Sequence, residues 1–224
     1  IWANCMWPKG VVMKAHYNGL IPRNPFIKFH ISPNVKEREY LTEDELKAVM
    51  THEFADSKLA YIRDIFIFAS FTALSFVDIQ ELTNDNIVEV NGEKWILSKR
   101  HKTKVAFQVK LLDIPLQIVE RYRPMQKDNR IFPGLNYWSI CKPLKRMIRE
   151  CGITKSISFH CSRHGFATLA LSKGMPIESV SRVLGHTNIV TTQLYAKITT
   201  QKLDNDLTMF GDKLSKTFNG ITMS

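Results

Sequence analysis

The stretch from residue 58 to residue 76, KLAYIRDIFIFASFTALSF, constrains the fold more than any other part of the chain. Its apolar side chains fall on nearly all sides of a helix, which is typical of a helix buried at the centre of a domain. Its length alone also suits a membrane segment, but Arg63 and Asp64 inside the stretch argue against burial in lipid. We therefore expect the central buried helix of a soluble domain.

The segment after this helix has the pattern of a small antiparallel sheet. Asn91 and Gly92 lie between two strand-like runs, and Asn-Gly in that position is a strong signal for a two-residue hairpin turn. A third run follows, in which apolar residues alternate as in a half-buried strand: Val105, Phe107, Val109 and Leu111. The sequence predicts a three-stranded antiparallel sheet from about residue 86 to residue 112.

Helical periodicity returns after the sheet, and glycines mark the ends of several of the predicted helices. We expect helices at 114–126, 136–151, 160–173, 177–184, 188–197 and 200–217. The fold class is therefore mainly α with one small antiparallel sheet, an α+β domain.

Residues 18–40 carry three prolines and mixed charges without sustained periodicity, and we interpret them as a linker. Thr42 and Glu45 after it form a capping-box pattern, which predicts the first helix of the main domain. We place the domain boundary between residues 36 and 37, so that 37–224 is the main domain. The chain begins with Ile rather than Met, and we expect it to be a fragment of a longer protein.

The charge of the chain and its cysteine content restrict the classes of binding partner and the cellular compartment that we expect. The chain has 31 Lys and Arg against 21 Asp and Glu, a net charge of +10, which favours binding to nucleic acid and less often to anionic lipid. Its four cysteines form no CxxC pair and are typical of reduced thiols in a cytoplasmic protein. No signal peptide and no uncharged span of roughly 18 apolar residues is present, so we expect no membrane association.

The segment HCSRHGFATLALSKG places His160, Arg163 and His164 at spacings of three and four, on one face of a helix. Arginine offers a bidentate fork to phosphate, and histidine exchanges a proton near neutral pH. Alone, this motif is more often the N-terminus of a helix whose basic side chains are exposed to solvent. His186 follows in a Leu-Gly-His turn, and Tyr195 comes nine residues later, where a tyrosine is also a common amphipathic core residue.

The combination of HxxRH, LGH about twenty residues later and Tyr nine residues beyond resembles the tyrosine recombinases, or phage integrase family. The resemblance covers residues 20 to 200. The sequence around the motifs is most similar to that of integrases of conjugative transposons. It implies the DNA breaking-rejoining fold for residues 37–224, with a tail helix at the end. Residues 1–36 would be the remnant of a core-binding domain and its linker.

This resemblance implies metal-free phosphoryl transfer on DNA, with no cofactor. Tyr195 would attack the scissile phosphate and form a 3′-phosphotyrosyl intermediate. Arg163, His160 and His186 would stabilise charge on the phosphate oxygens, and His160 is also a candidate acceptor of the tyrosine proton. Lys102, in the turn RHKT between the second and third strands, would protonate the departing 5′-oxygen.

The roles of four further residues stay open at this stage. Lys99 and Lys104 compete with Lys102 as the hairpin lysine, and Tyr137 is the first alternative to the nucleophile. His164 is expected to support its neighbours by packing or orienting them.

The sequence departs from the family at Ser75, where the pattern has an arginine, although Asp78 matches the acidic position three residues later. Arg63 is a candidate to compensate, but a structural ion pair with an acidic residue such as Asp78 is the simpler interpretation. Twelve helical residues, about 18 Å at 1.5 Å per residue, separate it from Ser75. We expect Ser75 to contribute no more than a hydrogen bond to the active-site network.

The resemblance further implies double-stranded DNA as partner, a homo-oligomer that forms a tetrameric synapse on DNA, and a bacterial cytoplasmic location. Without DNA, we expect the fragment to be a monomer. The alternatives are a non-catalytic DNA-binding protein derived from an integrase, a type IB topoisomerase, and a remote zinc site at His160, Cys161 and His164.

Overall fold

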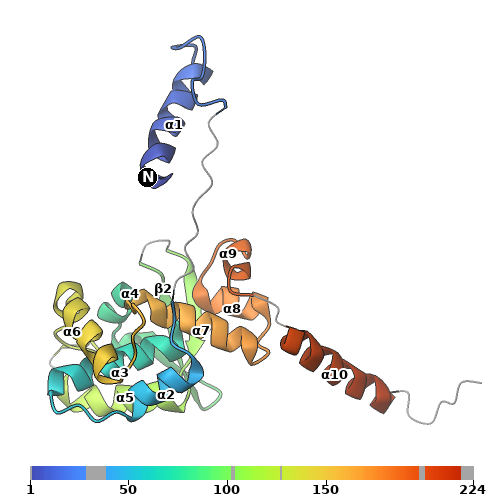
Figure 1. Cartoon of the computed structure of the whole chain (residues 1–224). Helices are drawn as coiled ribbons and strands as arrows, with labels where there is room; N and C mark the ends of the chain where they lie inside the picture. Colours follow the sequence, from blue (N-terminus) through green and yellow to red (C-terminus); the bar gives the residue numbers. More distant parts are fainter. Residues whose placement is uncertain (1, 29–38, 102–103, 127, 197–199, 218–224) are drawn as a thin grey trace, which may run out of the picture. The chain divides into compact units, whose positions relative to one another are not determined.

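A computed structural model describes residues 2–28, 39–101, 104–126, 128–196 and 200–217 (Figure 1). The chain divides into two compact units, Ile1–Arg38 and Glu39–Ser224. In the described part of the first unit there is one helix, α1 (Trp2–Tyr17). The interpretation of this unit as a core-binding remnant stays a prediction.

The long apolar stretch forms α3 (Ser57–Thr72), which is buried along most of its length, so the prediction of a central helix is confirmed. Four other helices contact it: α2 (Glu43–Thr51), α5 (Asp113–Tyr122), α6 (Tyr137–Glu150) and α7 (His160–Ser172). The predicted capping box is present at the start of α2, where Thr42 and Glu45 bond each other's backbone amides. These helices enclose one continuous apolar core.

The predicted helix over 58–76 is wrong at its end. The chain leaves α3 at Ala73, which has left-handed backbone angles with φ of 56°, and a new short helix, α4 (Phe76–Gln80), begins with Ser75 as its N-cap. A one-turn 3-10 helix (Asn84–Asn86) then leads into the sheet. The break places Ser75 and Asp78 on α4, beside the sheet, rather than on the central helix.

The sheet has the predicted form. Its strands β1 (Ile87–Val90), β2 (Glu93–Lys99) and β3 (Ala106–Lys110) pair antiparallel in the order β1-β2-β3. Asn91 and Gly92 both have positive φ, 53° and 78°, as a tight two-residue hairpin turn requires. Ile96 pairs with Ile87 on one side and Val109 on the other, and it is fully buried.

The remaining helices are α8 (Ile177–Leu184), α9 (Val190–Gln193) and α10 (Thr200–Thr217), with a 3-10 turn at Arg123–Met125 after α5. α9 is shorter than the predicted 188–197. A second, small apolar cluster joins the end of α3 to α7 and α8 through Ala73, Ala167, Leu171, Val180 and Leu184. The mainly helical fold with one small antiparallel sheet is therefore confirmed. None of the described helices is long and apolar enough to cross a bilayer.

Candidate active site

Arg163 is fixed between the ends of two helices. Its Nη1 donates to the carbonyl of Ala73 at 2.8 Å, and its Nη2 donates to the carbonyl of Leu184, the last residue of α8. The last carbonyls of a helix lack helical partners and carry partial negative charge, so they suit a guanidinium. Burial and the neighbouring Arg100 lower the pKa of Arg163 to about 10, which still leaves it protonated at neutral pH.

Arg100, which the sequence analysis did not select, lies directly after β2 and is only 6% exposed. Its Nη1 donates to Asp78 Oδ2 at 2.8 Å, and its Nη2 donates to the carbonyl of Val183 at 2.5 Å. Its guanidinium carbon lies 4.0 Å from the centre of the Phe107 ring. A signal was available, because Arg100 is four residues after the buried Ile96, and residues an even number apart share a strand face.

Asp78 joins α4 to the turn after β2. Its Oδ2 accepts from the Ser75 hydroxyl at 2.7 Å and from Arg100, and its Oδ1 accepts from the backbone amide of His101 at 3.1 Å. Burial alone would raise the pKa of Asp78, but these hydrogen bonds and the Arg100 charge outweigh it and lower the pKa. Asp78 is therefore a fixed carboxylate anion.

The site carries more buried positive charge than negative charge. Among the described residues, Asp78 is the one carboxylate paired with either Arg100 or Arg163. Burial lowers the pKa of Arg100 although Asp78 opposes this effect, and its Nε is buried with no hydrogen-bond partner in the described part of the chain. Two desolvated guanidiniums beside one carboxylate favour the binding of a further anion.

His186 lies beside these cations as a neutral ring. Its pKa is lowered to about 4 by burial first, and then by Arg163, Arg100 and His160. Its Nδ1 lies 2.9 Å from the hydroxyl of Thr192, a second residue that the sequence analysis did not select. His186 is therefore available as a hydrogen-bond donor without a charge of its own.

The ring of Tyr195 packs against a histidine ring of the HxxRH motif. The His164 ring lies 5.1 Å from the Tyr195 ring and 4.7 Å from the His160 ring, centroid to centroid. The structure thus brings His160, Arg163, His164, His186 and Tyr195 into one neighbourhood, together with Asp78 and Ser75.

The predicted general acid, Lys102, lies outside the described residues. Of its two competitors, Lys99 is exposed at the end of β2, and Lys104 is exposed in the turn with a φ of 56°. The two described residues that precede Lys102, Arg100 and His101, both donate to Asp78.

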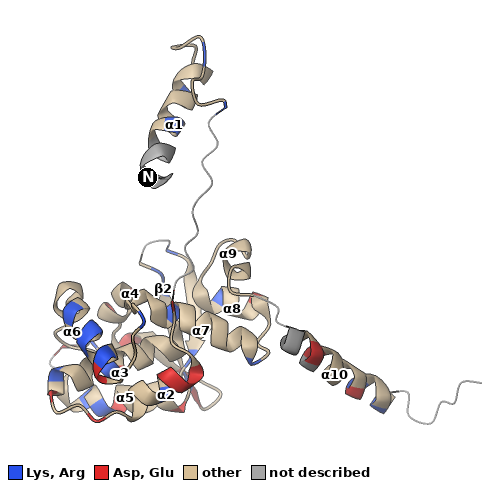
Figure 2. Ribbon diagram, viewed as in Figure 1, with Lys and Arg blue, Asp and Glu red and all other residues tan. Residues whose placement is uncertain are grey.

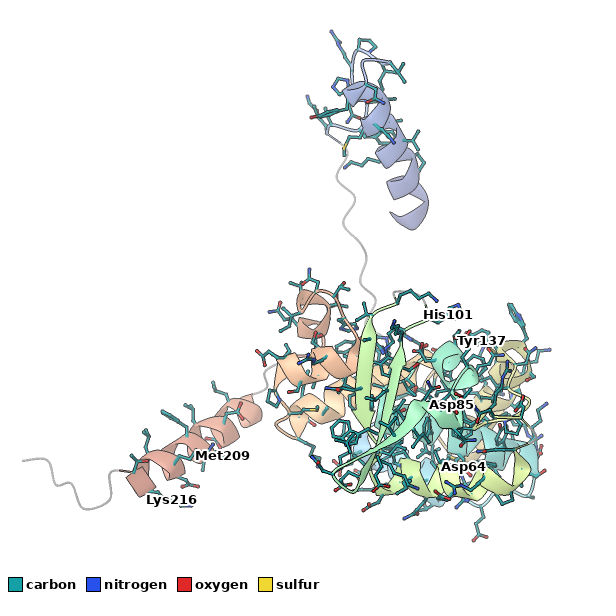
Figure 3. The ribbon with its side chains drawn as sticks, turned by 180° about the vertical axis from the view of Figure 1, so that it is seen from behind. Asp64, Asp85, His101, Tyr137, Met209 and Lys216 are labelled. Carbon is teal, nitrogen blue, oxygen red and sulfur yellow. The ribbon has the colours of Figure 1, made fainter. Side chains whose placement is uncertain are left out.

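Arg63 is not part of this neighbourhood. Its Nε pairs with Asp64 Oδ1 at 2.9 Å, and its Nη1 donates to the carbonyl of His52 at 2.9 Å. The suggested pair with Asp78 is wrong, because Arg100 occupies that carboxylate. Figure 3 shows Asp64 far from His101, the neighbour of Arg100.

Tyr137, the alternative nucleophile, is half-exposed at the start of α6, and its ring packs on Phe76 at 5.4 Å.

The structure gives no support to the suggested zinc site. In the described part of the chain, no group of three or more His, Cys, Asp or Glu is placed to hold a metal ion. Cys161, from the suggested zinc set, is buried with its sulfur 3.3 Å from the Ser158 hydroxyl.

Comparisons with known proteins show the family of the chain. The phage integrase family model matches residues 39–202. The tyrosine recombinase XerA of Pyrococcus horikoshii is 32% identical over 177 residues, which cover 73% of this chain and 58% of that protein. XerC of Lactobacillus leichmannii is 26% identical over 200 residues, covering 83% and 67%.

Solved structures show the same fold. The Tn1549 transposon integrase in complex with a circular intermediate DNA superposes with a TM-score of 0.75 at 17% identity, covering 90% of this chain and 76% of that one. A XerA recombinase crystal structure gives 0.61 at 20% identity, covering 88% and 72%. This chain spans little more than half the length of the Pyrococcus relative. It belongs to the phage integrase family and has the fold of a tyrosine recombinase catalytic domain.

Proposed function

We propose that this chain is the catalytic part of a site-specific DNA recombinase that cleaves and rejoins DNA during integration or excision of a mobile element. One observation carries the proposal: the buried guanidinium of Arg100 and the partly buried guanidinium of Arg163 lie close together near Tyr195, and Asp78, which pairs with Arg100, is the carboxylate that offsets their charge among the described residues. A DNA phosphodiester is an anion that would restore the charge balance. The family supports recombination, and the Tn1549 integrase is the neighbour that supports a mobile element.

The reaction conserves the number of phosphoester bonds. The Tyr195 oxygen attacks phosphorus as the bond from phosphorus to the 5′-oxygen breaks, which leaves a 3′-phosphotyrosyl link. The tyrosine proton passes to a base, for which His160 is the candidate, and the 5′-oxygen receives a proton from Lys102. Arg163 and the neutral His186 donate to the non-bridging oxygens, whose charge grows in the transition state. Rejoining reverses these steps.

Arg100 supplies the second cation in place of the arginine that is missing at Ser75. The family pattern puts the arginine and its acidic partner on the same short segment. Here the acidic partner, Asp78, is retained and pairs with a guanidinium that comes from the end of β2. Arg100 thus reaches the same carboxylate from another element, two residues before Lys102 in the chain.

Covalent capture tests both parts of this proposal. The chain is incubated with a nicked duplex carrying the attachment site of its element, and a covalent protein–DNA species is sought on a denaturing gel. Wild type should form the adduct, and Tyr195→Phe should abolish it while DNA affinity stays nearly unchanged. An adduct with Tyr195→Phe would assign the nucleophile elsewhere, with Tyr137 tested next.

For Arg100, the variants are Arg100→Ala and Arg100→Lys, and the revertant is Ser75→Arg combined with Arg100→Ala. Loss of one preorganised cation should cost about 10²- to 10³-fold in capture rate. A guanidinium returned at residue 75 should recover part of that loss, and so should a methylphosphonate substrate, which carries one negative charge less. If neither restores capture, Arg100 has only a structural role.

Several surfaces fit a DNA-bound assembly. Figure 2 shows Lys and Arg gathered on α6, where Lys142, Lys145, Arg146 and Arg149 are all exposed. Such residues contact phosphates without reading sequence. The amphipathic α10 exposes apolar residues, including Leu207 and Phe210, and we propose that it docks onto a neighbouring copy in a tetrameric synapse in the bacterial cytoplasm.

The second candidate is a non-catalytic DNA-binding protein, and Ser75 is the observation that favours it. DNA binding without any covalent species, at matched protein concentrations, would support this candidate.

A further inference from the structure

Thr192 contacts both His186 and the segment that carries Tyr195. It lies on α9 and is fully buried, and its hydroxyl lies 2.9 Å from His186 Nδ1. Its carbonyl accepts a hydrogen bond from the backbone amide of Tyr195 at 3.0 Å. Thr192 thus contacts His186 through its side chain and the backbone of Tyr195 through its carbonyl.

The direction of the side-chain hydrogen bond follows from burial. A buried hydroxyl proton needs an acceptor. In the described part of the chain, the partner of the Thr192 hydroxyl is His186 Nδ1. Thr192 therefore donates, and Nδ1 accepts.

This direction fixes the tautomer of the histidine. Burial and the neighbouring positive charges keep His186 neutral, because they lower its pKa to about 4. A neutral imidazole has one N–H, and an Nδ1 that accepts leaves the proton on Nε2. The other tautomer would turn a lone pair, rather than a donor, toward a phosphate oxygen at Nε2.

We propose that Thr192 is a positioning residue that holds His186 in the Nε2–H tautomer and ties it to the segment that carries Tyr195. The inference rests on the proposed recombinase function and deepens it. Thr192 touches no DNA atom in this scheme and acts through its two neighbours. Its hydroxyl is required, and its methyl group only fills space.

Three substitutions separate the hydroxyl from packing. Thr192→Val keeps the shape and removes the hydroxyl, whereas Thr192→Ser keeps the hydroxyl and removes the methyl. Thr191→Val makes the same chemical change at the exposed neighbouring residue and serves as the control. Thermal melting of each variant checks that it is folded.

Two readouts are measured on the whole chain. At saturating nicked DNA, Thr192→Val should slow covalent capture about 10- to 100-fold, the scale of losing an outer hydrogen-bond partner of a functional histidine. Thr192→Ser should stay within about threefold of wild type, and Thr191→Val should be unchanged. In ¹⁵N NMR spectra, the His186 ring should be protonated on Nε2 in wild type and become a tautomer mixture in Thr192→Val.

Equal capture rates for wild type and Thr192→Val would overturn the inference, and so would a wild-type ring protonated on Nδ1. Equal losses in Thr192→Ser and Thr192→Val would show that packing, not the hydroxyl, matters. If wild type itself forms no adduct, the recombinase proposal fails. The NMR spectra of the free protein then still decide whether Thr192 sets the tautomer.

Discussion

The Ser75 hydroxyl lies 2.7 Å from Asp78 Oδ2, and this hydrogen bond is part of the capping box that closes the first turn of α4. The residue that replaces the family's arginine is therefore a helix cap. Its side chain bonds to Asp78, which in turn accepts a hydrogen bond from Arg100, so we expect any effect of Ser75 on the proposed reaction to pass through Asp78.

Ser75→Ala should lower the free energy of unfolding by about 1 kcal/mol, the usual cost of losing an N-cap. Asp78 keeps its bonds to Arg100 and His101, so covalent capture should fall less than tenfold. Arg163→Ala should cost far more, because it removes a cation from the phosphate. Urea titration and capture kinetics measure the two effects, and comparable capture losses would show a direct role for Ser75.

Gly185→Ala should impair the site through Arg100. A Cβ at residue 185 would lie 3.0 Å from Arg100 Nε and 3.1 Å from its Cγ, so the arginine would have to shift and its hydrogen bond to Asp78 would be disturbed. We expect at least a tenfold loss of capture. Gly152→Ala is the matched control, since φ is +74° there against +64° at Gly185 and nothing lies within 4 Å of the added atom. Equal losses in both variants would point to backbone strain alone.

The stability of the domain should depend on pH through His186. Its pKa in the folded state is lowered to about 4. In the unfolded state it titrates near about 6.5. Between these values the unfolded chain binds the extra proton, so stability falls as the pH falls.

Wild type should therefore lose more stability than His186→Gln between about pH 6.5 and pH 4. The difference between the two should level off outside that window. Urea titrations at a series of pH values test this, and parallel curves for the two proteins would contradict it.

Lys102→Ala should be rescued by a substrate with sulfur in place of the 5′-bridging oxygen, because a thiolate leaves without being protonated. Single-turnover cleavage of the two substrates gives the comparison. If the sulfur substrate instead rescues Lys99→Ala or Lys104→Ala, the general acid is at that other position of the hairpin.

Arg63→Ala should affect stability and not chemistry. The substitution removes a partner of the buried Asp64 and a donor to the His52 carbonyl, at a cost of about 1 to 3 kcal/mol. Asp64 keeps Arg121 and Tyr122, each at 2.7 Å, so the fold should survive. Below its melting temperature the variant should capture DNA at the wild-type rate; a large loss there would place Arg63 in the site after all.

The elements that local pattern determines could be predicted from the sequence. The all-round apolar stretch gave a central helix, and Asn91 with Gly92 gave the hairpin, because both signals depend on neighbours in the chain. The end of α3 was missed, since nothing local distinguishes the left-handed turn at Ala73 from continued helix.

Only those residues of the candidate site that belong to the spaced motifs, such as Arg163 and Tyr195, could be predicted from the sequence. The search for a compensating arginine followed the central helix and selected Arg63. Arg100 reaches Asp78 through the docking of β2 against α4, a tertiary relationship that no local spacing encodes. Thr192 was missed for a different reason: it is only six residues after His186, but its hydroxyl reaches the ring through the particular path of the turn after α8, which the motif spacing does not specify.

Val183 and Leu184 are consecutive residues, and their carbonyls hold Arg100 and Arg163 respectively. Both guanidiniums are thus mounted on the last turn of α8, whose position is set by the buried side chains of Val180 and Leu184. A small displacement of α8 would therefore move both guanidiniums together, relative to the DNA phosphate that we propose they bind. The positions of the two cations are therefore coupled through one helix end, and a substitution that shifts α8 should disturb both of them at once.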